Sequence, residues 1–330
     1  MKLSTKMLKI VIGFVCSIPL IFFGYTTWCG AAKQTPALPT ETNAWLVYWD
    51  MPNSLAELAE ENYDSISYFA AYFSDEDKLI LPDDFDPAVL QDNAAPIKYL
   101  SVVNDVVSDN KSDLKSIDVV KRTLDDDLKK VDQADEIIDM AEKNGFNGID
   151  LDYEQVFKDK TAAAEYLDFI KILYDKASEK DIKLRVILEP SVKFADYTFP
   201  QGPQYVVMMY NLYGLHSGPG PKADFAFIER TAKNMKALPG SLGAAFANGG
   251  CLWGSNGDKK LISTSQAEAL LQKYQVDPKR DPESSALYFS YEEDGVTYTV
   301  WFADKKTLAD WTEKASKVGI SSASIWRLGG

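Results

Sequence analysis

The segment NGIDLDYE, residues 147–154, places acidic and apolar side chains in strict alternation. Its three carboxylates belong to Asp150, Asp152 and Glu154. On a β-strand, a period of two puts these carboxylates on one face and the intervening Ile, Leu and Tyr on the other. We therefore predict a strand with one apolar face for packing and one acidic face for chemistry.

Apolar segments of β type alternate with amphipathic segments on both sides of this stretch. We expect strands at residues 44–50, 65–73, 97–105, 147–156, 182–191, 205–211, 242–250 and 322–330. The expected helices are 54–62, 119–145, 161–180, 225–238 and 307–319. Eight strand–helix alternations over about 290 residues predict an α/β fold, a (β/α)8 TIM barrel, rather than an open doubly wound sheet. No GxGxxG motif follows the first strand, which argues against a dinucleotide-binding domain.

The barrel hypothesis gives the acidic strand face a location. The apolar face would pack on the helices, so the acids would point inward at the C-terminal end, where active sites of this fold lie. Crowding in a low dielectric raises the pKa of at least one carboxyl, as a general acid requires. A calcium loop would carry Gly and polar residues where this segment has Leu and Tyr. A solvated strand edge would rarely place Ile, Leu and Tyr between its acids.

A small α+β insertion is expected between strand seven and the last helix, at about residues 255–302. It contains an extra helix, TSQAEALLQKY (264–274), and a hairpin, ALYFSYEEDGVTYTVWF (286–302), turning at Asp294-Gly295. We place the insertion beside the substrate cleft. The barrel domain, insertion included, is expected to run from residue 43 to residue 330.

The N-terminal residues predict targeting. Residues 1–29 begin with three lysines and then run apolar from 10 to 23, which is typical of a secretory signal peptide. The apolar run is shorter than the ~20 residues that cross a bilayer, so a retained membrane anchor is the second choice. Cys29 offers lipid attachment as another route to the membrane, although Trp28 departs from the small residue such sites have before the cysteine. Residues 30–42 are small, polar and Pro-containing, and indicate a linker. We expect a secreted or cell-surface-attached protein.

Composition excludes several classes of function. The 330 residues contain 49 Asp and Glu against 35 Lys and Arg, a net charge of −14, and loss of 1–29 removes three lysines and no acids to give −17. Such a surface repels nucleic acid. Apart from Cys16 and Cys29 in the targeting segment, Cys251 is a lone cysteine, so neither an intramolecular disulfide nor a zinc site is expected, and no metal site is predicted. We expect a monomer.

Four segments resemble glycoside hydrolase family 18, the chitinase-like hydrolases. NGIDLDYE resembles the fourth-strand pattern DGxDxDxE, with Asn147 in place of the first Asp. YVVMMYN (205–211) is similar to the sixth-strand pattern M-x-Y-D, through Met208 and Tyr210. SIWRLGG (324–330) is similar to the eighth-strand segment whose Trp floors the sugar site, here Trp326. The hairpin and the Val-Trp-Phe-x-Asp segment after it resemble bacterial members of the spore-cortex and peptidoglycan-lytic branch. The resemblance covers about residues 41–330.

The resemblance implies a mechanism in which the substrate takes part. Glu154 would protonate the glycosidic oxygen, and the substrate's 2-acetamido oxygen would attack the anomeric carbon to give an oxazolinium intermediate with net retention. Asp152 would orient the acetamido N–H, Asp150 would lie behind Asp152 and share its proton, and Tyr210 would hydrogen-bond the acetamido oxygen. Glu154 would then act as the base for water. The partner is an N-acetylglucosamine-containing glycan, and neither a metal nor an organic cofactor is required.

Departures from the family pattern bear on the substrate. Residues 101–105 (SVVND) lack the glycines of the usual third-strand segment, and Asn211 replaces the usual Asp. The missing glycines, together with the hairpin insertion, favour a cell-envelope or soluble glycan over crystalline chitin.

Further residues at strand ends are candidates for the cleft. Glu189 ends the fifth strand, with a structural acid as an equal alternative. Trp49 and Trp253 end strands one and seven, and would either stack on sugars or be buried at the rim. His216, in a Gly/Pro-rich loop, receives no role.

A function of another class stays open beside the enzyme. The same barrel can serve a catalytically silent sugar-binding protein, and fold alone does not separate the two. Retention of the acid at Glu154 favours the enzyme.

Overall fold

The computed structural model of the chain describes residues 41–90, 93–108 and 111–330. The expected signal peptide or anchor at 1–29, including Cys29, lies outside the described residues, as do residues 30–40 of the expected linker. Of the helices described, none has the length and apolar character needed to cross a bilayer.

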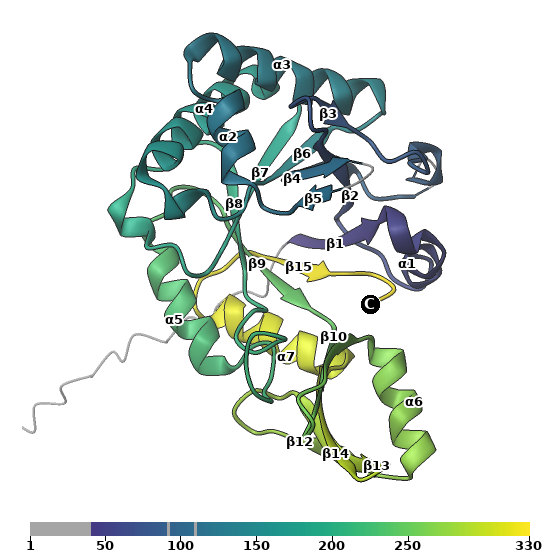
Figure 1. The fold of residues 1–330 in the computed structure, drawn as a ribbon. Coiled ribbons are helices and arrows are strands. Elements are labelled where there is room, and N and C mark those ends of the chain that lie inside the picture. The colour runs from purple at the N-terminus through teal and green to yellow at the C-terminus, as the bar shows by residue number, and fades with distance from the viewer. Residues whose placement is uncertain (1–40, 91–92, 109–110) are drawn as a thin grey trace, which may run out of the picture. The chain divides into compact units, whose positions relative to one another are not determined.

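Eight parallel strands close into a barrel (Figure 1). In order around the barrel they are β1 (Glu41–Val47), β2 (Ser65–Phe73), β4 (Ile97–Ser108), β6 (Gly148–Asp152), β7 (Lys183–Leu188), β8 (Gln204–Met208), β9 (Leu242–Ala247) and β15 (Ser322–Trp326). The first and last strands close the barrel, with Asn43 in register with Ser324. All eight overlap segments expected to be strands, so the (β/α)8 prediction is confirmed. The first expected strand, 44–50, is displaced, because β1 ends at Val47 and residues 48–50 form a 3-10 turn.

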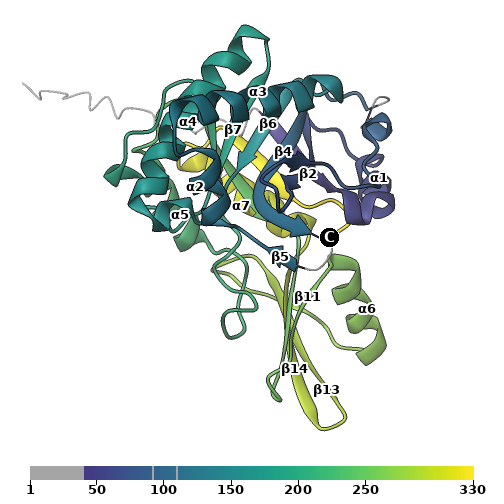
Figure 2. The same ribbon diagram turned by 45° about the horizontal axis from the view of Figure 1, so that its top comes forward.

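The helices cover the outside of the barrel, as Figure 2 shows for α2, α3 and α4. They are α1 (Met51–Leu58), α2 (Ile117–Thr123), α3 (Asp127–Lys143), α4 (Lys160–Glu179), α5 (Phe225–Met235) and α7 (Lys305–Lys317). The single helix expected at 119–145 is two helices, because Asp126 is extended and its side chain accepts the Lys129 N–H as the N-cap of α3.

Short elements complete the connections. They are η1 (Tyr48–Asp50), β3 (Leu79–Ile80), η2 (Pro87–Leu90), β5 (Lys111–Asp113), η3 (Val156–Lys158) and η4 (Phe194–Asp196). In the described chain, the β2–β4 and β7–β8 connections hold 3-10 turns where a regular barrel has an α-helix. Residues of both connections, among them Leu90 and Phe194, are nevertheless buried in the main core.

The inserted region forms an antiparallel sheet of its own with one helix. It consists of β10 (Gly249–Gly254), β11 (Lys259–Ile262), α6 (Thr264–Tyr274), β12 (Lys279–Arg280), β13 (Leu287–Glu293) and β14 (Val296–Ala303). The expected helix and the hairpin turn are present, with Asp294 and Gly295 both at positive φ. The strands β10, β11 and β12 were not expected. The segment expected as one strand at 242–250 divides at Gly249, whose φ of +59° few other residues adopt.

Three hydrophobic clusters support the described chain, and one of them contains Trp45, Val206 and Met208. The largest one lies between barrel and helices and contains Ile149, Leu151 and Tyr153, the apolar face of the acidic segment. A smaller one, with Phe289 and Val300 at its centre, holds α6 against the inserted sheet. The alternation in 147–154 thus turns its carboxylates into the barrel, away from the helices.

Candidate active site

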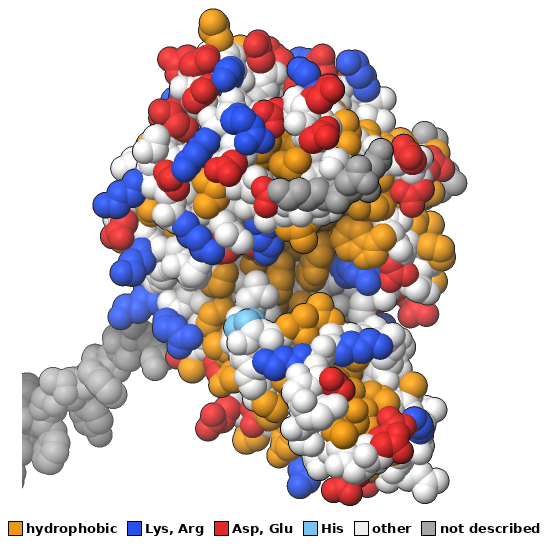
Figure 3. Space-filling view, in the orientation of Figure 1, with side chains coloured by type: hydrophobic (Ala, Val, Ile, Leu, Met, Phe, Trp, Pro, Cys, Tyr) orange, Lys and Arg blue, Asp and Glu red, His pale blue; other side chains and the backbone are white. Residues whose placement is uncertain are grey.

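A cavity of about 250 Å³ opens at the C-terminal ends of the barrel strands. It is lined by Phe69, Val103, Asn104, Asp105, Leu114, Lys115, Asp152, Glu154, Met208, Tyr210, Asn211 and Trp326. Figure 3 shows a hollow with hydrophobic side chains between the barrel and the inserted region. Six residues expected in the site from sequence therefore share one cavity, while Asp150 lies beneath it, fully buried.

Asp150 forms a bidentate ion pair with Arg185. Arg185 was not among the site residues predicted from the sequence. The Arg185 Nε and Nη2 atoms donate to Asp150 Oδ1 and Oδ2 over 2.6 and 2.7 Å. The Ser101 hydroxyl also donates to Asp150 Oδ2 over 3.3 Å. Both carboxylate oxygens of Asp150 are thus engaged by charged or polar donors, and the sharing of a proton with Asp152 stays a prediction.

Arg185 is itself buried, and its guanidinium contacts side chains from several barrel strands. Its Nη2 donates to Ser67 Oγ and Asn43 Oδ1 over 2.9 and 3.1 Å. Its guanidinium carbon lies 4.3 Å from the Tyr99 ring centre and 5.2 Å from that of Trp45. The sequence signal was available, since Arg185 is a charged residue within an apolar strand.

Asp152 faces the cavity from the end of β6. Burial raises the pKa of its carboxyl well above the usual range, and Glu154 and Asp150 raise it further by charge repulsion. Within the described part of the chain, Asp152 Oδ1 is buried and has no hydrogen-bond partner. This oxygen is available to a donor that enters the cavity.

Glu154 follows β6 by two residues, and its side chain forms an ion pair in the cavity. The Lys115 ammonium lies 2.6 Å from Glu154 Oε2. Burial raises the pKa of Glu154, Lys115 lowers it, and Glu189 and Asp105 raise it again, with an upward shift overall. A carboxyl with a raised pKa is what a general acid at neutral pH needs.

Asn104, on β4, fixes the backbone of Glu154 from the neighbouring strand. Its Oδ1 accepts the Glu154 N–H over 2.8 Å, and its Nδ2 donates to the Glu154 carbonyl over 3.0 Å. Asn104 belongs to the glycine-free segment 101–105, to which the sequence prediction gave no role. A buried Asn clamping the residue after a strand gives no periodic signal in the sequence.

Glu189, the residue after β7, holds the backbone of the same segment by a hydrogen bond. Its Oε2 accepts the N–H of Gln155 over 2.7 Å, and Gln155 has a left-handed backbone with φ +63°. Glu189 does not line the cavity, so the structure places it as a support for the Glu154 turn.

The remaining cavity wall comes from β8 and β15. Tyr210 is half-buried, and burial followed by the charges of Asp152 and Glu154 raises the pKa of its hydroxyl. Met208 is buried beneath it and Asn211 is exposed at the opening. Trp326 packs edge to face on Phe69, with ring centres 5.1 Å apart. This wall offers an aromatic surface beside the carboxyls.

The other two candidate tryptophans, Trp49 and Trp253, do not line the cavity. Trp49 is half-exposed and lies edge to face with Phe69, outside the cavity lining. Trp253 is buried in the inserted sheet, where its Nε1 donates to the Ser217 carbonyl over 3.2 Å. In this structure Trp253 therefore presents no face for sugar stacking and corresponds to the buried alternative. Across the described residues there is no group of His, Cys, Asp and Glu placed to hold a metal ion.

Comparison with known proteins points to one family. Residues 120–330 match the sequence profile of the glycosyl hydrolases family 18. The chain is 26% identical over 254 residues, 70% of either chain, to a Bacillus subtilis protein named uncharacterized glycosylase YvbX. It is 35% identical over 75 residues, 22% of its own length and 17% of the relative's, to the cortical fragment-lytic enzyme of Bacillus anthracis.

Solved structures show the same fold. The spore cortex-lytic enzyme SleL of Bacillus cereus superposes with a TM-score of 0.73 at 21% identity, covering 88% of this chain and 71% of that one. A chitinase from Chromobacterium violaceum also gives a TM-score of 0.73, at 20% identity, covering 89% of this chain and 95% of the other.

Proposed function

The chain belongs to the glycosyl hydrolases of family 18 and is a glycosidase of that family, and we propose that it cleaves β-linked N-acetylglucosamine glycans with retention, using the substrate's own acetamido group. Candidate polymers are chitin oligomers, peptidoglycan strands and the N-glycan core. The observation that carries the proposal is Asp152, whose Oδ1 lacks a partner in a cavity that also holds Glu154 and Tyr210.

In the first step Glu154 donates its proton to the glycosidic oxygen as the bond to the anomeric carbon breaks. The acetamido oxygen forms the new bond to that carbon, giving an oxazolinium ion. The raised pKa of Glu154 supports this role, since the proton must still be present near neutral pH.

The unpartnered oxygen of Asp152 is suited to accept the acetamido N–H, which holds the acetamido oxygen on the correct side and balances the charge that develops. The Tyr210 hydroxyl is suited to donate to the acetamido oxygen. In the second step the Glu154 carboxylate takes a proton from water as the water oxygen bonds to the anomeric carbon, and the bond from that carbon to the acetamido oxygen breaks. Two inversions at this carbon leave the configuration retained.

The test measures release of 4-methylumbelliferone from chitobiose and chitotriose conjugates. We expect Glu154→Gln to reduce kcat by about 10²–10⁴-fold, the range for loss of general acid–base catalysis, while glycan binding persists. Glu179→Gln, an exposed carboxyl at the end of α4, is the matched control. Near-wild-type turnover in Glu154→Gln would overturn the assignment.

The acetamido step has its own readout. A thiazoline analogue of N-acetylglucosamine should inhibit competitively, and a plain glucoside should be inert. Comparable hydrolysis of the glucoside would exclude participation of the substrate. Export, inferred from residues 1–29, is part of the proposal and is supported by sequence alone.

A further inference from the structure

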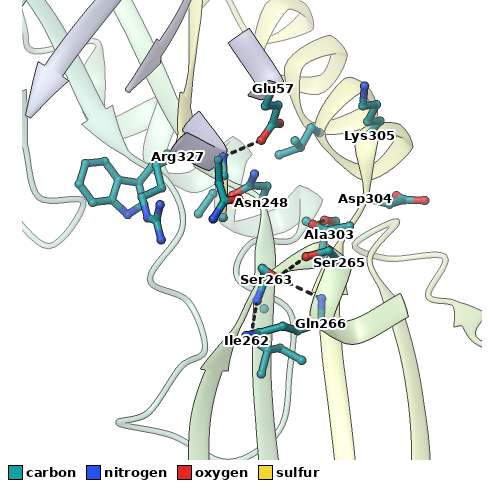
Figure 4. A pocket seen from close by; sticks show the side chains of 18 of the residues that line it. Glu57, Asn248, Ile262, Ser263, Ser265, Gln266, Ala303, Asp304, Lys305 and Arg327 are labelled. Carbon is teal, nitrogen blue, oxygen red and sulfur yellow. Dashed lines mark hydrogen bonds between the residues drawn. The ribbon is translucent and has the colours of Figure 1, made fainter. Parts of the chain in front are cut away.

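A second cavity, of about 830 Å³, shares Trp326 with the catalytic one. It lies between the barrel, the start of α6 and the C-terminal segment after β15 (Figure 4). In that view Arg327 lies on one side and Asp304 with Lys305 on the other. A sugar chain that passes over Trp326 from the catalytic cavity would extend into this space.

Three cationic side chains line the second cavity, and two of them are neutralised. Arg327 Nη1 lies 2.7 Å from Asp50 Oδ2, and Lys305 Nζ lies 2.7 Å from Glu61 Oε1. The third, Lys222, has no ion pair and no side-chain hydrogen bond to any residue of the described chain. It is the cation in this cavity whose charge a ligand can still neutralise.

The Lys222 side chain is partly shielded from solvent by its neighbours. Its carbonyl accepts the Leu212 N–H over 3.0 Å, which fixes the backbone one residue past Asn211 of the catalytic cavity. Its side chain is half-buried beside the inserted strand β10. Burial lowers the pKa of Lys222, and the neighbouring Cys251 thiol opposes this weakly. An ammonium held this way is stabilised when an anion pairs with it.

The carboxylates of the cavity restrict which anion fits. Asp50 and Asp304 are paired with Arg327 and Arg280, and Glu57 accepts the Gly329 N–H over 2.7 Å. Glu60 and Glu268 also line the cavity and would repel a dianion. The one unpaired cation in the cavity therefore suits a carboxylate better than a phosphate, and Asn248, which lines the same cavity, carries an amide donor.

We propose that Lys222 binds a carboxylate carried by the sugar chain, so that the preferred substrates are acidic N-acetylated glycans. This inference rests on the proposed function, because it places the acidic sugar next to the unit held in the catalytic cavity. The carboxylate group would be a substituent of the glycan, such as a lactyl ether, and not a free anion.

The experiment measures binding by calorimetry to the full chain carrying Glu154→Gln. The two ligands are a tetrasaccharide of N-acetylglucosamine with 3-O-lactyl groups on alternate sugars, and the same tetrasaccharide with those carboxylates converted to carboxamides. We expect the acid to bind at least tenfold more tightly than the amide, the size of a charge-assisted hydrogen bond.

Adding Lys222→Met should bring this ratio to within about twofold of one, because the charge is lost while the chain length is kept. Lys305→Met is the matched control from the same cavity and should leave the ratio at tenfold or more. If Lys222→Met fails to fold, the ratio measured in 50 and 500 mM NaCl replaces it, and it should fall with salt.

A ratio near one before Lys222 is changed would overturn the inference, as would an equal loss in the two lysine variants or no binding of either ligand. The proposed function is tested separately, by hydrolysis of the neutral conjugate. A wild-type protein that hydrolyses the neutral chitotriose conjugate but shows no acid preference contradicts only the inference, whereas acid preference without hydrolysis contradicts only the enzyme.

Discussion

At the scale of single residues, Asp150 and Arg185 depend on one another. Both are fully buried and meet at 2.6 Å inside the barrel. A buried ion pair adds little net stability, but removal of one partner leaves the other charge uncompensated in a low dielectric.

We therefore expect Arg185→Met to lower the free energy of unfolding by about 3–5 kcal/mol, measured by urea denaturation followed by circular dichroism. The double variant Asp150→Asn with Arg185→Met should recover most of this loss, because no charge is left unpaired. A single variant within about 1 kcal/mol of wild type would contradict the dependence.

The ion pair between Lys115 and Glu154 sets the ionisation of the proposed acid. Lys115 lowers the pKa of Glu154 against burial, Glu189 and Asp105, which raise it. In turn, the charge of Glu154 is one cause of the raised pKa of Asp152.

Lys115→Met should therefore raise the pKa of Glu154 further. Since the acid form is the active one, the alkaline limb of the kcat/KM profile should move to higher pH, measured with the chitotriose conjugate. Lys121→Met, an exposed lysine on α2, is the control and should leave the limb in place. A limb that moves to lower pH in Lys115→Met would contradict the assignment of Glu154 as the acid.

The residues of the site differ in how far sequence reveals them. Asp152 and Trp326 end strands with a strong pattern, Glu154 and Tyr210 each follow a strand by two residues, and the structure brings all four around one cavity. Lys115 comes from a loop 39 residues away from its partner, and no local pattern encodes that meeting. The roles of the residues stay predictions until the variants are measured.

At the scale of elements, β4 positions the segment that follows β6. Asn104 makes two hydrogen bonds to the backbone of Glu154 and one, over 3.1 Å, to the Ser116 carbonyl. It thus joins the Glu154 turn to the loop that carries Lys115.

Asn104→Ala should reduce kcat by about 10²-fold with a much smaller change in KM, because Glu154 loses its alignment. Asn234→Ala removes a comparable amide-to-carbonyl hydrogen bond, 2.6 Å to Val192, far from the cavity. Equal losses of activity in the two variants would indicate general destabilisation. Thermal unfolding of both completes the comparison.

The elements themselves were largely predictable, and the exceptions have physical causes. The eight strands follow from apolar runs bounded by loops, whereas Asp126 divides a continuous helical pattern by capping α3. The short strands β11 and β12 are largely exposed and polar, so hydrophobic patterning does not reveal them.

At the scale of the whole described molecule, a hydrogen bond and an ion pair join the inserted region to α7 and its first residues. Trp311 Nε1 donates to the Ser284 carbonyl over 2.6 Å, and Arg280 pairs with Asp304 at the start of the helix. Cys251 is buried in β10, opposite Trp301 of β14 in the inserted sheet.

In a Cys16→Ser, Cys29→Ser variant, labelling of the Cys251 thiol in urea should follow the same transition as far-ultraviolet circular dichroism. The reason is that the hydrogen bond and the ion pair to α7 prevent the inserted sheet from unfolding independently of the barrel. Labelling well below the unfolding midpoint would instead show that the region opens independently. Circular dichroism of the labelled protein distinguishes opening from damage by the reagent.

The seam between β1 and β15 has a consequence for how the molecule is made. Synthesis delivers β1 early and β15 after about 280 further residues, because they begin at Glu41 and Ser322. Until the last strand emerges from the ribosome, β1 and β9 each present an unpaired edge, and Arg185 lacks Ser324 as a partner. In the nascent chain the barrel therefore cannot close before translation ends. Until then we expect chaperones to bind the unpaired edges of β1 and β9.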